Sequence, residues 1–139
     1  MIIRKLNIRG WRCFFCFALD RYNADVILSR LEELEAPPSI LRRVRRNVRL
    51  DRMDTGFTYS NLFLRESVIV IGRSSSGAEF LNSFVHELRH LADDIAFVYG
   101  YPLRGEEVAY LTGDIALALS DVVCAMSCEV CRKDGISSL

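Results

Sequence analysis

The feature that most constrains the fold is a long amphipathic pattern from about Gly77 to Tyr99. Apolar residues recur along it at helical spacing, at Leu81, Phe84, Leu88, Leu91 and Ile95. The opposite side carries polar and ionisable residues, namely Glu79, Ser83, His86, Glu87, His90, Asp93 and Asp94. Gly100-Tyr101-Pro102 then interrupts the pattern. The sequence therefore predicts one long helix with an apolar back and an ionisable front.

The ionisable front contains the segment His86-Glu87-Leu88-Arg89-His90, which holds both histidines of the chain. Residues four apart stack on the same side of a helix, so the two imidazoles can reach a single ion. Glu87 lies beside them, where a carboxylate can take a proton from a water that the ion activates. Two neutral nitrogen ligands and a nearby base are the arrangement that zinc-dependent peptide hydrolysis needs.

A catalytic zinc usually has three protein ligands, and Glu106 and Glu107 open a second predicted helix, from about residue 104 to about residue 128. Small residues form a stripe along this helix, which would let it approach the motif helix closely: Ala109, Gly113, Ala116 and Ser120. Glu106 borders the stripe together with Tyr110, whereas Glu107 points about 100° away. Helical periodicity therefore favours Glu106 as the third ligand, with Glu107 as the alternative.

Residues 57–120 resemble a zincin metallopeptidase of the gluzincin type, in which H-E-x-x-H lies on one helix and a ligand glutamate opens a later helix. The segment Glu106-Glu107-Val108-Ala109-Tyr110 resembles the second motif of that family, although Asp or Asn is commoner than Tyr at its last position. The strand pair before the motif helix also resembles the zincin layout. The resemblance implies a small α+β domain with a short sheet, helices, and a metal site between the last two long helices.

The resemblance also implies residue roles. Zn²⁺ would be held by His86, His90 and Glu106, with Glu107 as the alternative, and Glu87 would act as the general base. Tyr110 would donate a hydrogen bond to an oxyanion. Asp93 and Asp94 would orient an imidazole. The implied activity is a zinc metallopeptidase, a hydrolase whose substrate is a peptide or protein.

The rest of the chain reads as part of the same α+β domain, which we expect to span residues 1–139. Residues 1–19 are strand-rich, and helices are predicted at about 23–35 and 39–49. Residues 57–59 and 67–71 form a predicted hairpin, because Val68-Ile69-Val70-Ile71 is β-branched throughout. The Ser- and Gly-rich segment at 72–77 is then a turn that caps the motif helix.

The cysteines allow two metal sites besides the histidine pair. Cys124-x3-Cys128-x2-Cys131 has the spacing of the cluster-binding cysteines in radical-SAM enzymes, but it lies in a helical segment at the end of a small chain. Cys13 and Cys16 could join the last two cysteines in a four-thiolate zinc site. Because residues three apart on a strand point to opposite faces, the sequence favours buried free cysteines instead.

Six arginines between Arg42 and Arg52 form a basic cluster that could meet nucleic acid or an acidic partner. The acidic segment Glu32-Glu33-Leu34-Glu35 precedes it and the formal net charge is zero, so the sequence favours a solvated, internally paired face and no nucleic-acid partner. The alternative function is a non-catalytic zincin-like module that binds protein or nucleic acid through this basic helix. A structural zinc that merely ties the last two helices together is a third reading, and a solvated histidine face paired with Arg89 is the non-functional one.

Composition fits an ordinary cytoplasmic protein. No signal-peptide pattern begins the sequence, and Asp114 and Asp121 interrupt its most apolar stretch, so no membrane span is expected. Five cysteines are an odd number, which fits reduced thiols better than a disulfide framework. Cleavage specificity and oligomeric state are open at this point.

Overall fold

The computed structural model describes residues 1–134, which form a mixed α+β protein with a four-stranded sheet and six α-helices. The chain divides into two compact units, Met1–Arg73 and Ser74–Leu139. We call the first the sheet unit, because it holds all the strands of the described chain, and the second the helical unit. The predicted α+β class is confirmed at this level.

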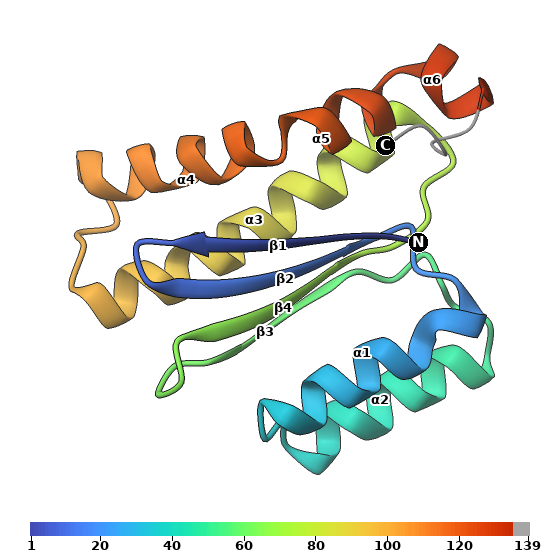
Figure 1. The fold of residues 1–139 in the computed structure, drawn as a ribbon, viewed down its shortest axis with the longest axis horizontal. Coiled ribbons are helices and arrows are strands. Elements are labelled where there is room, and N and C mark those ends of the chain that lie inside the picture. The colour runs from blue at the N-terminus through green and yellow to red at the C-terminus, as the bar shows by residue number, and fades with distance from the viewer. Residues whose placement is uncertain (135–139) are drawn as a thin grey trace. The chain divides into compact units, whose positions relative to one another are not determined.

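The sheet has the strand order β1-β2-β4-β3 (Figure 1). Its strands are β1 (Ile2–Ile8), β2 (Trp11–Phe17), β3 (Phe57–Asn61) and β4 (Glu66–Ile71). The pairs β1–β2 and β3–β4 are antiparallel hairpins, whereas β2 and β4 pair in parallel. The strand-rich start and the later hairpin are as predicted. The parallel join between them is a feature that the sequence did not indicate.

A two-residue turn closes the first hairpin. Arg9 and Gly10 both have positive φ, 52° and 80°, which is the geometry that matches the right-handed twist of the flanking strands. The Gly10 amide donates to Asn7 Oδ1 at 3.1 Å. This turn fixes the register in which Ile8 faces Trp11, and so decides which side chains of β1 and β2 share a face.

One face of the sheet packs on two helices of the same unit, α1 (Ala24–Glu33) and α2 (Pro38–Arg49), which follow the short 3-10 helix η1 (Arg21–Asn23) (Figure 1). The buried cluster between them includes Phe14, Cys16, Val68 and Val70 from the strands and Ile27, Leu31 and Val44 from the helices. Each fully buried Ile or Leu contributes about 1.5–3 kcal/mol. Both predicted helices are confirmed within two residues of their expected ends.

The helical unit contains α3 (Gly77–Tyr99), α4 (Glu106–Ala118), α5 (Ser120–Ser127) and α6 (Glu129–Asp134). Helix α3 has the predicted bounds because its caps are encoded locally. The Ser76 hydroxyl accepts from the Glu79 amide at 3.2 Å, and Gly100 ends the helix in the left-handed region at φ 72°. Hydrogen bonds from the Ser75 hydroxyl and amide also hold the pKa of Glu79 below its ordinary value.

The second predicted helix is not continuous, which corrects the expectation of one helix over residues 104–128. It consists of α4 and α5, bent by 71° at Leu119, which has ψ 10° and belongs to neither helix. The apolar spacing of the sequence could not predict this break, because it depends on the backbone dihedral angles of one residue. Within residues 1–134, no single helix is both long and apolar enough to cross a membrane, and only the bent α4–α5 pair taken together reaches that composition.

The start of α3 is held by the segment around α6. The Gly77 amide donates to Glu129 Oε1 at 2.6 Å, and Arg132 Nη2 donates to the Ser74 carbonyl at 2.5 Å. Gly77 is required here, because a Cβ at this position would lie 2.1 Å from the Ser127 carbonyl oxygen. These contacts fix the end of the helix that carries both histidines.

Candidate metal centre

His86 and His90 lie one turn apart on α3 and their side chains converge. Both residues are exposed, the Nε2 atoms are 3.2 Å apart, and the ring centroids are 4.8 Å apart at an interplanar angle of 77°. The spacing of four residues along the helix produces this approach, as the sequence predicts. The pair therefore places two imidazole nitrogens side by side on the exposed side of the helix, within hydrogen-bonding distance of each other.

The separation of the two nitrogens matches the bite of a single zinc ion. Zinc–nitrogen bonds of about 2.0–2.1 Å at a tetrahedral angle place two ligand atoms about 3.3 Å apart. The observed separation is 3.2 Å, close to this distance, and in the structure the two Nε2 atoms share a hydrogen bond. The histidine pair thus fits the group that the sequence motif implies.

Glu87 differs from the two histidines in its surroundings. Its exposed fraction is 6%, so it is buried rather than part of the exposed front that the sequence predicts. The reason is its position on the helix: Glu87 follows Phe84 by three residues and precedes Leu91 by four, and both of these are buried. It is one of two buried polar residues in the described chain, and it borders the histidine pair.

The apolar back of α3 also differs from the prediction in one place. Phe80 is fully buried, whereas Leu81 is 42% exposed, although the sequence pattern assigned Leu81 to the core. The two residues are neighbours at the edge of the apolar side, so a small rotation of the helix decides which one is covered. Phe84, Leu88, Leu91 and Ile95 are buried as predicted.

The stripe of small residues on α4 does not pack as expected. Ala109, Gly113 and Ser120 are exposed, and a Cβ at Gly113 would meet nothing within 4 Å. The buried side of α4 instead carries Leu111 and Ile115. Glu107 precedes Leu111 by four residues and lies nearer that side than Glu106 does. The packing reason for preferring Glu106 is therefore wrong, and the choice between these two exposed glutamates stays a prediction.

Arg89, which lies between the two histidines in the motif, has an acidic partner of its own. Arg89 Nε donates to Asp93 Oδ1 at 2.9 Å, and Tyr110 is 65% exposed. Among residues 1–134, no three His, Cys, Asp or Glu side chains gather into a group that could hold a metal ion. The structure thus supplies two converging nitrogens, and the third ligand and the role of Tyr110 remain predictions.

The cysteines divide between the two units. Cys13 and Cys16 are buried on β2, and burial raises the pKa of each thiol to about 12. Cys124 and Cys131 are exposed, and hydrogen bonds from Cys131 hold the pKa of Cys128 below its ordinary value. All five are free thiols, which confirms the prediction of buried free cysteines on β2.

The basic cluster lies on α2 and just beyond it, and its six arginines are exposed. Arg45 donates to Glu32 Oε1 at 3.1 Å, while within residues 1–134 the other five side chains make no ion pair. Arg42, Arg46 and Arg49 follow the spacing of one helical side, opposite the buried Val44. The predicted internal pairing is therefore found for one arginine of the six.

Comparison with protein-family models, with curated proteins and with solved structures gives no match for this chain. The proposals below accordingly rest on the geometry of the described residues and on the sequence motifs.

Proposed function

We propose that this chain is a zinc-dependent hydrolase of peptide bonds, with His86 and His90 as metal ligands. The observation that carries the proposal is the 3.2 Å separation of the two Nε2 atoms, which suits one tetrahedral zinc. Glu106 or Glu107, both in the first turn of α4, would supply the third ligand. The proposed location is the cytoplasm.

The protein groups have distinct tasks in this proposal. Zinc, when bound, polarises the scissile carbonyl and activates water. Glu87 takes the proton of the attacking water and returns it to the leaving amine. Its burial beside an exposed histidine pair keeps one carboxylate partly shielded from bulk water. Tyr110 would donate to the developing oxyanion.

Metal analysis of the purified full chain tests the first part. We expect one zinc per chain, and loss of zinc in His86→Ala, with affinity reduced more than ~100-fold because a direct ligand matters more than the groups that orient it. Glu106→Gln and Glu107→Gln form a matched pair. Only the substitution that removes the true ligand should weaken zinc binding. Wild-type protein that takes up no zinc would overturn the proposal.

Hydrolysis of fluorescein-labelled casein tests the second part. Glu87→Gln keeps the size of the side chain and should bind zinc normally, while the rate falls by about 10²–10⁴ because the proton acceptor is lost. Zinc bound with no hydrolysis by wild type would favour a structural metal between α3 and the following helices. An unchanged rate in Glu87→Gln would remove the catalytic role.

A second function has its own observation, the five arginines on and after α2 whose side chains make no ion pair with the described part of the chain. The sheet unit carries 14 Lys and Arg against eight Asp and Glu, a formal charge of +6. Guanidinium groups bind phosphates in a bidentate manner, and no aromatic side chain interleaves with the arginines for base stacking. We propose that this face binds the phosphate backbone of duplex nucleic acid without reading sequence.

Fluorescence anisotropy with a mixed-sequence DNA duplex tests this function at several salt concentrations. Each phosphate contact contributes about 0.9 to the slope of log affinity against log salt, so Arg42→Gln/Arg46→Gln should lower the slope by about 1.8. Arg9→Gln/Arg21→Gln changes the net charge of the same unit equally and should leave the slope nearly unchanged. Equal losses in both double variants would mean general charge attraction and no defined face. Binding of an acidic peptide in place of the duplex would assign the face to a protein partner.

A further inference from the structure

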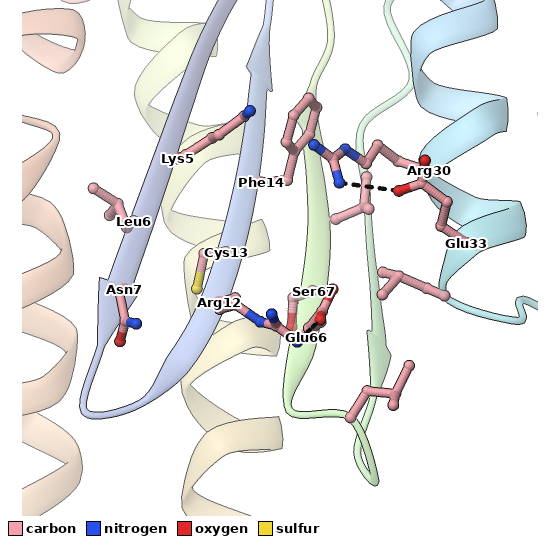
Figure 2. A pocket seen from close by; sticks show the side chains of 13 residues that line it. Lys5, Leu6, Asn7, Arg12, Cys13, Phe14, Arg30, Glu33, Glu66 and Ser67 are labelled. Atoms are coloured by element: carbon pink, nitrogen blue, oxygen red, sulfur yellow. Dashed lines mark hydrogen bonds and ion pairs between the residues drawn. The ribbon is translucent and has the colours of Figure 1, made fainter.

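A cavity of about 570 Å³ opens on the sheet unit, between the sheet and the end of α1 (Figure 2). Its volume is in the range of small-molecule sites, which run from about 300 to 1,000 Å³. Every lining residue belongs to residues 5–68, so the cavity is built by the sheet unit alone. It is separate from the histidine pair and from the basic face of α2.

The strand register sets two rows of side chains across the floor of the cavity. In one row Lys5 pairs with Phe14, and Phe14 pairs with Val68; in the next row Asn7 pairs with Arg12, and Arg12 with Glu66. Because alternate residues of a strand share a face, both rows point to the side that α1 covers. The floor is therefore apolar beneath α1 and polar beyond it.

Two cations converge on the Phe14 ring. The Arg30 guanidinium carbon lies 4.6 Å and the Lys5 ammonium 5.9 Å from the ring centroid, and Figure 2 shows them reaching the ring from β1 and from α1. Like charges repel, and the ring face attracts both of these cations. An anion placed above the ring would be attracted by both.

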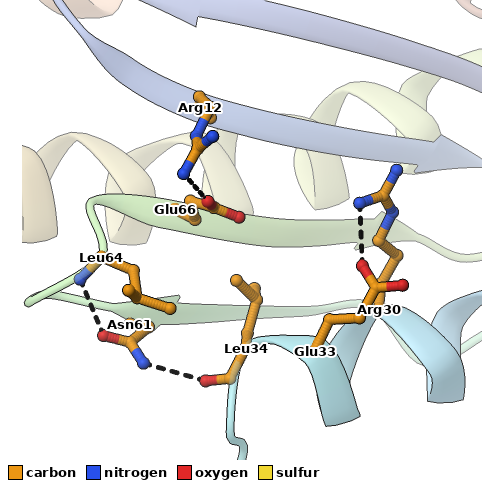
Figure 3. A network of polar contacts seen from close by, with 7 residues as sticks. All are labelled: Arg12, Arg30, Glu33, Leu34, Asn61, Leu64 and Glu66. Atoms are coloured by element: carbon orange, nitrogen blue, oxygen red, sulfur yellow. Dashed lines mark hydrogen bonds and ion pairs between the residues drawn. The ribbon is translucent and has the colours of Figure 1, made fainter.

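The carboxylates of the cavity are already engaged by arginines. Glu33 Oε2 accepts from Arg30 Nη1 at 3.0 Å, and Glu66 pairs with Arg12 (Figure 3). Lys5 makes no ion pair with any of residues 1–134. The cavity therefore retains one uncompensated positive charge, located at the edge of the apolar row.

We propose that this cavity binds a small amphipathic anion, a compact aryl or alkyl group that carries one carboxylate or phosphate. The anionic group would sit between Lys5 and Arg30, and the apolar body would lie on Phe14, Leu34 and Leu64. Leu34 and Leu64 line the cavity with wholly apolar side chains, and Leu64 is 39% exposed, so they favour the apolar part of such a ligand. The site belongs to the sheet unit and does not depend on the proposed hydrolase.

Calorimetric titration of the full chain with phenyl phosphate and with benzoate tests the site and separates the two anionic groups. We expect saturable binding of at least one, with inorganic phosphate or acetate at least tenfold weaker because it lacks the apolar body. Lys5→Gln should weaken binding at least tenfold, since it removes the uncompensated charge. Lys5→Arg should restore binding to within about threefold.

Arg21→Gln is the matched control, because it removes an exposed cation of the same unit that neither lines the cavity nor belongs to the basic cluster of α2. Its affinity should stay within twofold of wild type. Equal losses in Lys5→Gln and Arg21→Gln, or equal affinity for phenyl phosphate and inorganic phosphate, would overturn the proposal. Absence of saturable binding of either aryl anion by wild type would overturn it as well.

Discussion

The two units of this protein carry opposite charges. The sheet unit has 14 basic and eight acidic side chains, while the helical unit has four basic and ten acidic ones, which gives formal charges of +6 and −6. The net charge of zero therefore describes neither unit. An argument from whole-chain charge excludes polyanion binding, whereas the charge of the sheet unit alone favours it.

The units also differ in the burial of their cysteines and in how closely their backbone packs. The sheet unit buries Cys13 and Cys16 within a strand, where solvation of a thiolate is lost. In the helical unit Cys124 and Cys131 are exposed. The backbone of Ser127 approaches Gly77 so closely that a Cβ would not fit there. Thiol labelling and the stability of variants should consequently give different results for the two units.

The largest contrast is expected in thiol labelling. With iodoacetamide at pH 7, Cys124, Cys128 and Cys131 should react more than ~1,000-fold faster than Cys13 and Cys16. A thiol of pKa about 12 is ionised to only about 10⁻⁵ at pH 7, against a few per cent for an ordinary thiol. Peptide mass spectrometry over a time course measures the rates. Comparable labelling rates at all five cysteines of the folded protein would contradict this difference between the units. Urea-unfolded protein, in which all five are exposed, is the control.

Alkaline pH should weaken the sheet unit. The thiols of Cys13 and Cys16 ionise near 9 when unfolded and near 12 when folded, so only the unfolded state loses these protons between the two values. Their contribution to stability is fully present below pH 9 and is lost as pH rises toward 12. Trp11, the only tryptophan and a buried residue of this unit, reports urea unfolding by fluorescence at pH 8 and pH 10.5. In Cys13→Ala/Cys16→Ala the loss between these pH values should shrink, and an unchanged loss would assign it to other groups.

A smaller effect is expected from two glycines of the helical unit. Gly77→Ala should lower the free energy of unfolding by about 1–3 kcal/mol, because the added Cβ would clash with the Ser127 carbonyl oxygen. Gly113→Ala has open space around it and should raise stability by about 0.5–1 kcal/mol, as is usual within a helix. Urea unfolding followed by circular dichroism compares the two, and hydrogen exchange should localise the first effect to the start of α3. The same sign for both variants would contradict the close approach at Gly77.

The smallest effect concerns the one paired arginine of the basic cluster. Arg45→Gln should change the free energy of unfolding by less than about 0.5 kcal/mol, because the pair with Glu32 is exposed and screened. Arg43→Gln, which breaks no ion pair, is the control. A loss of more than 1 kcal/mol specific to Arg45 would show that pairing stabilises α2, and would weaken the view of this helix as a binding face.

Most elements of this fold could be predicted from local patterns. Helix α3 was predicted at its observed bounds, because apolar spacing, the Ser76 cap and Gly100 all act within a few residues of the chain. The convergence of His86 and His90 was equally predictable, since residues four apart on a helix are neighbours whatever the rest of the chain does. Both strands of the second hairpin were visible for the same local reason.

The candidate site was less predictable beyond the histidine pair. The burial of Glu87 and the exposure of Leu81 depend on a rotation of α3 that adjacent apolar residues leave open. The stripe of small residues on α4 indicated close packing, but Gly113 faces open space. Periodicity shows which residues share a side of a helix and does not show which side is covered. The sheet-unit cavity was missed because Lys5 and Phe14 are paired only by strand register.

The sequence by itself determined the class of elements, the helix that carries the histidines and the spacing that lets both imidazoles meet. These properties are set by interactions between residues a few positions apart. The tertiary structure decided the parallel pairing of β2 with β4, the burial of Glu87 and the convergence of Lys5 and Arg30 on Phe14. These features depend on contacts between segments that are distant in the chain, and a local sequence pattern cannot predict such contacts.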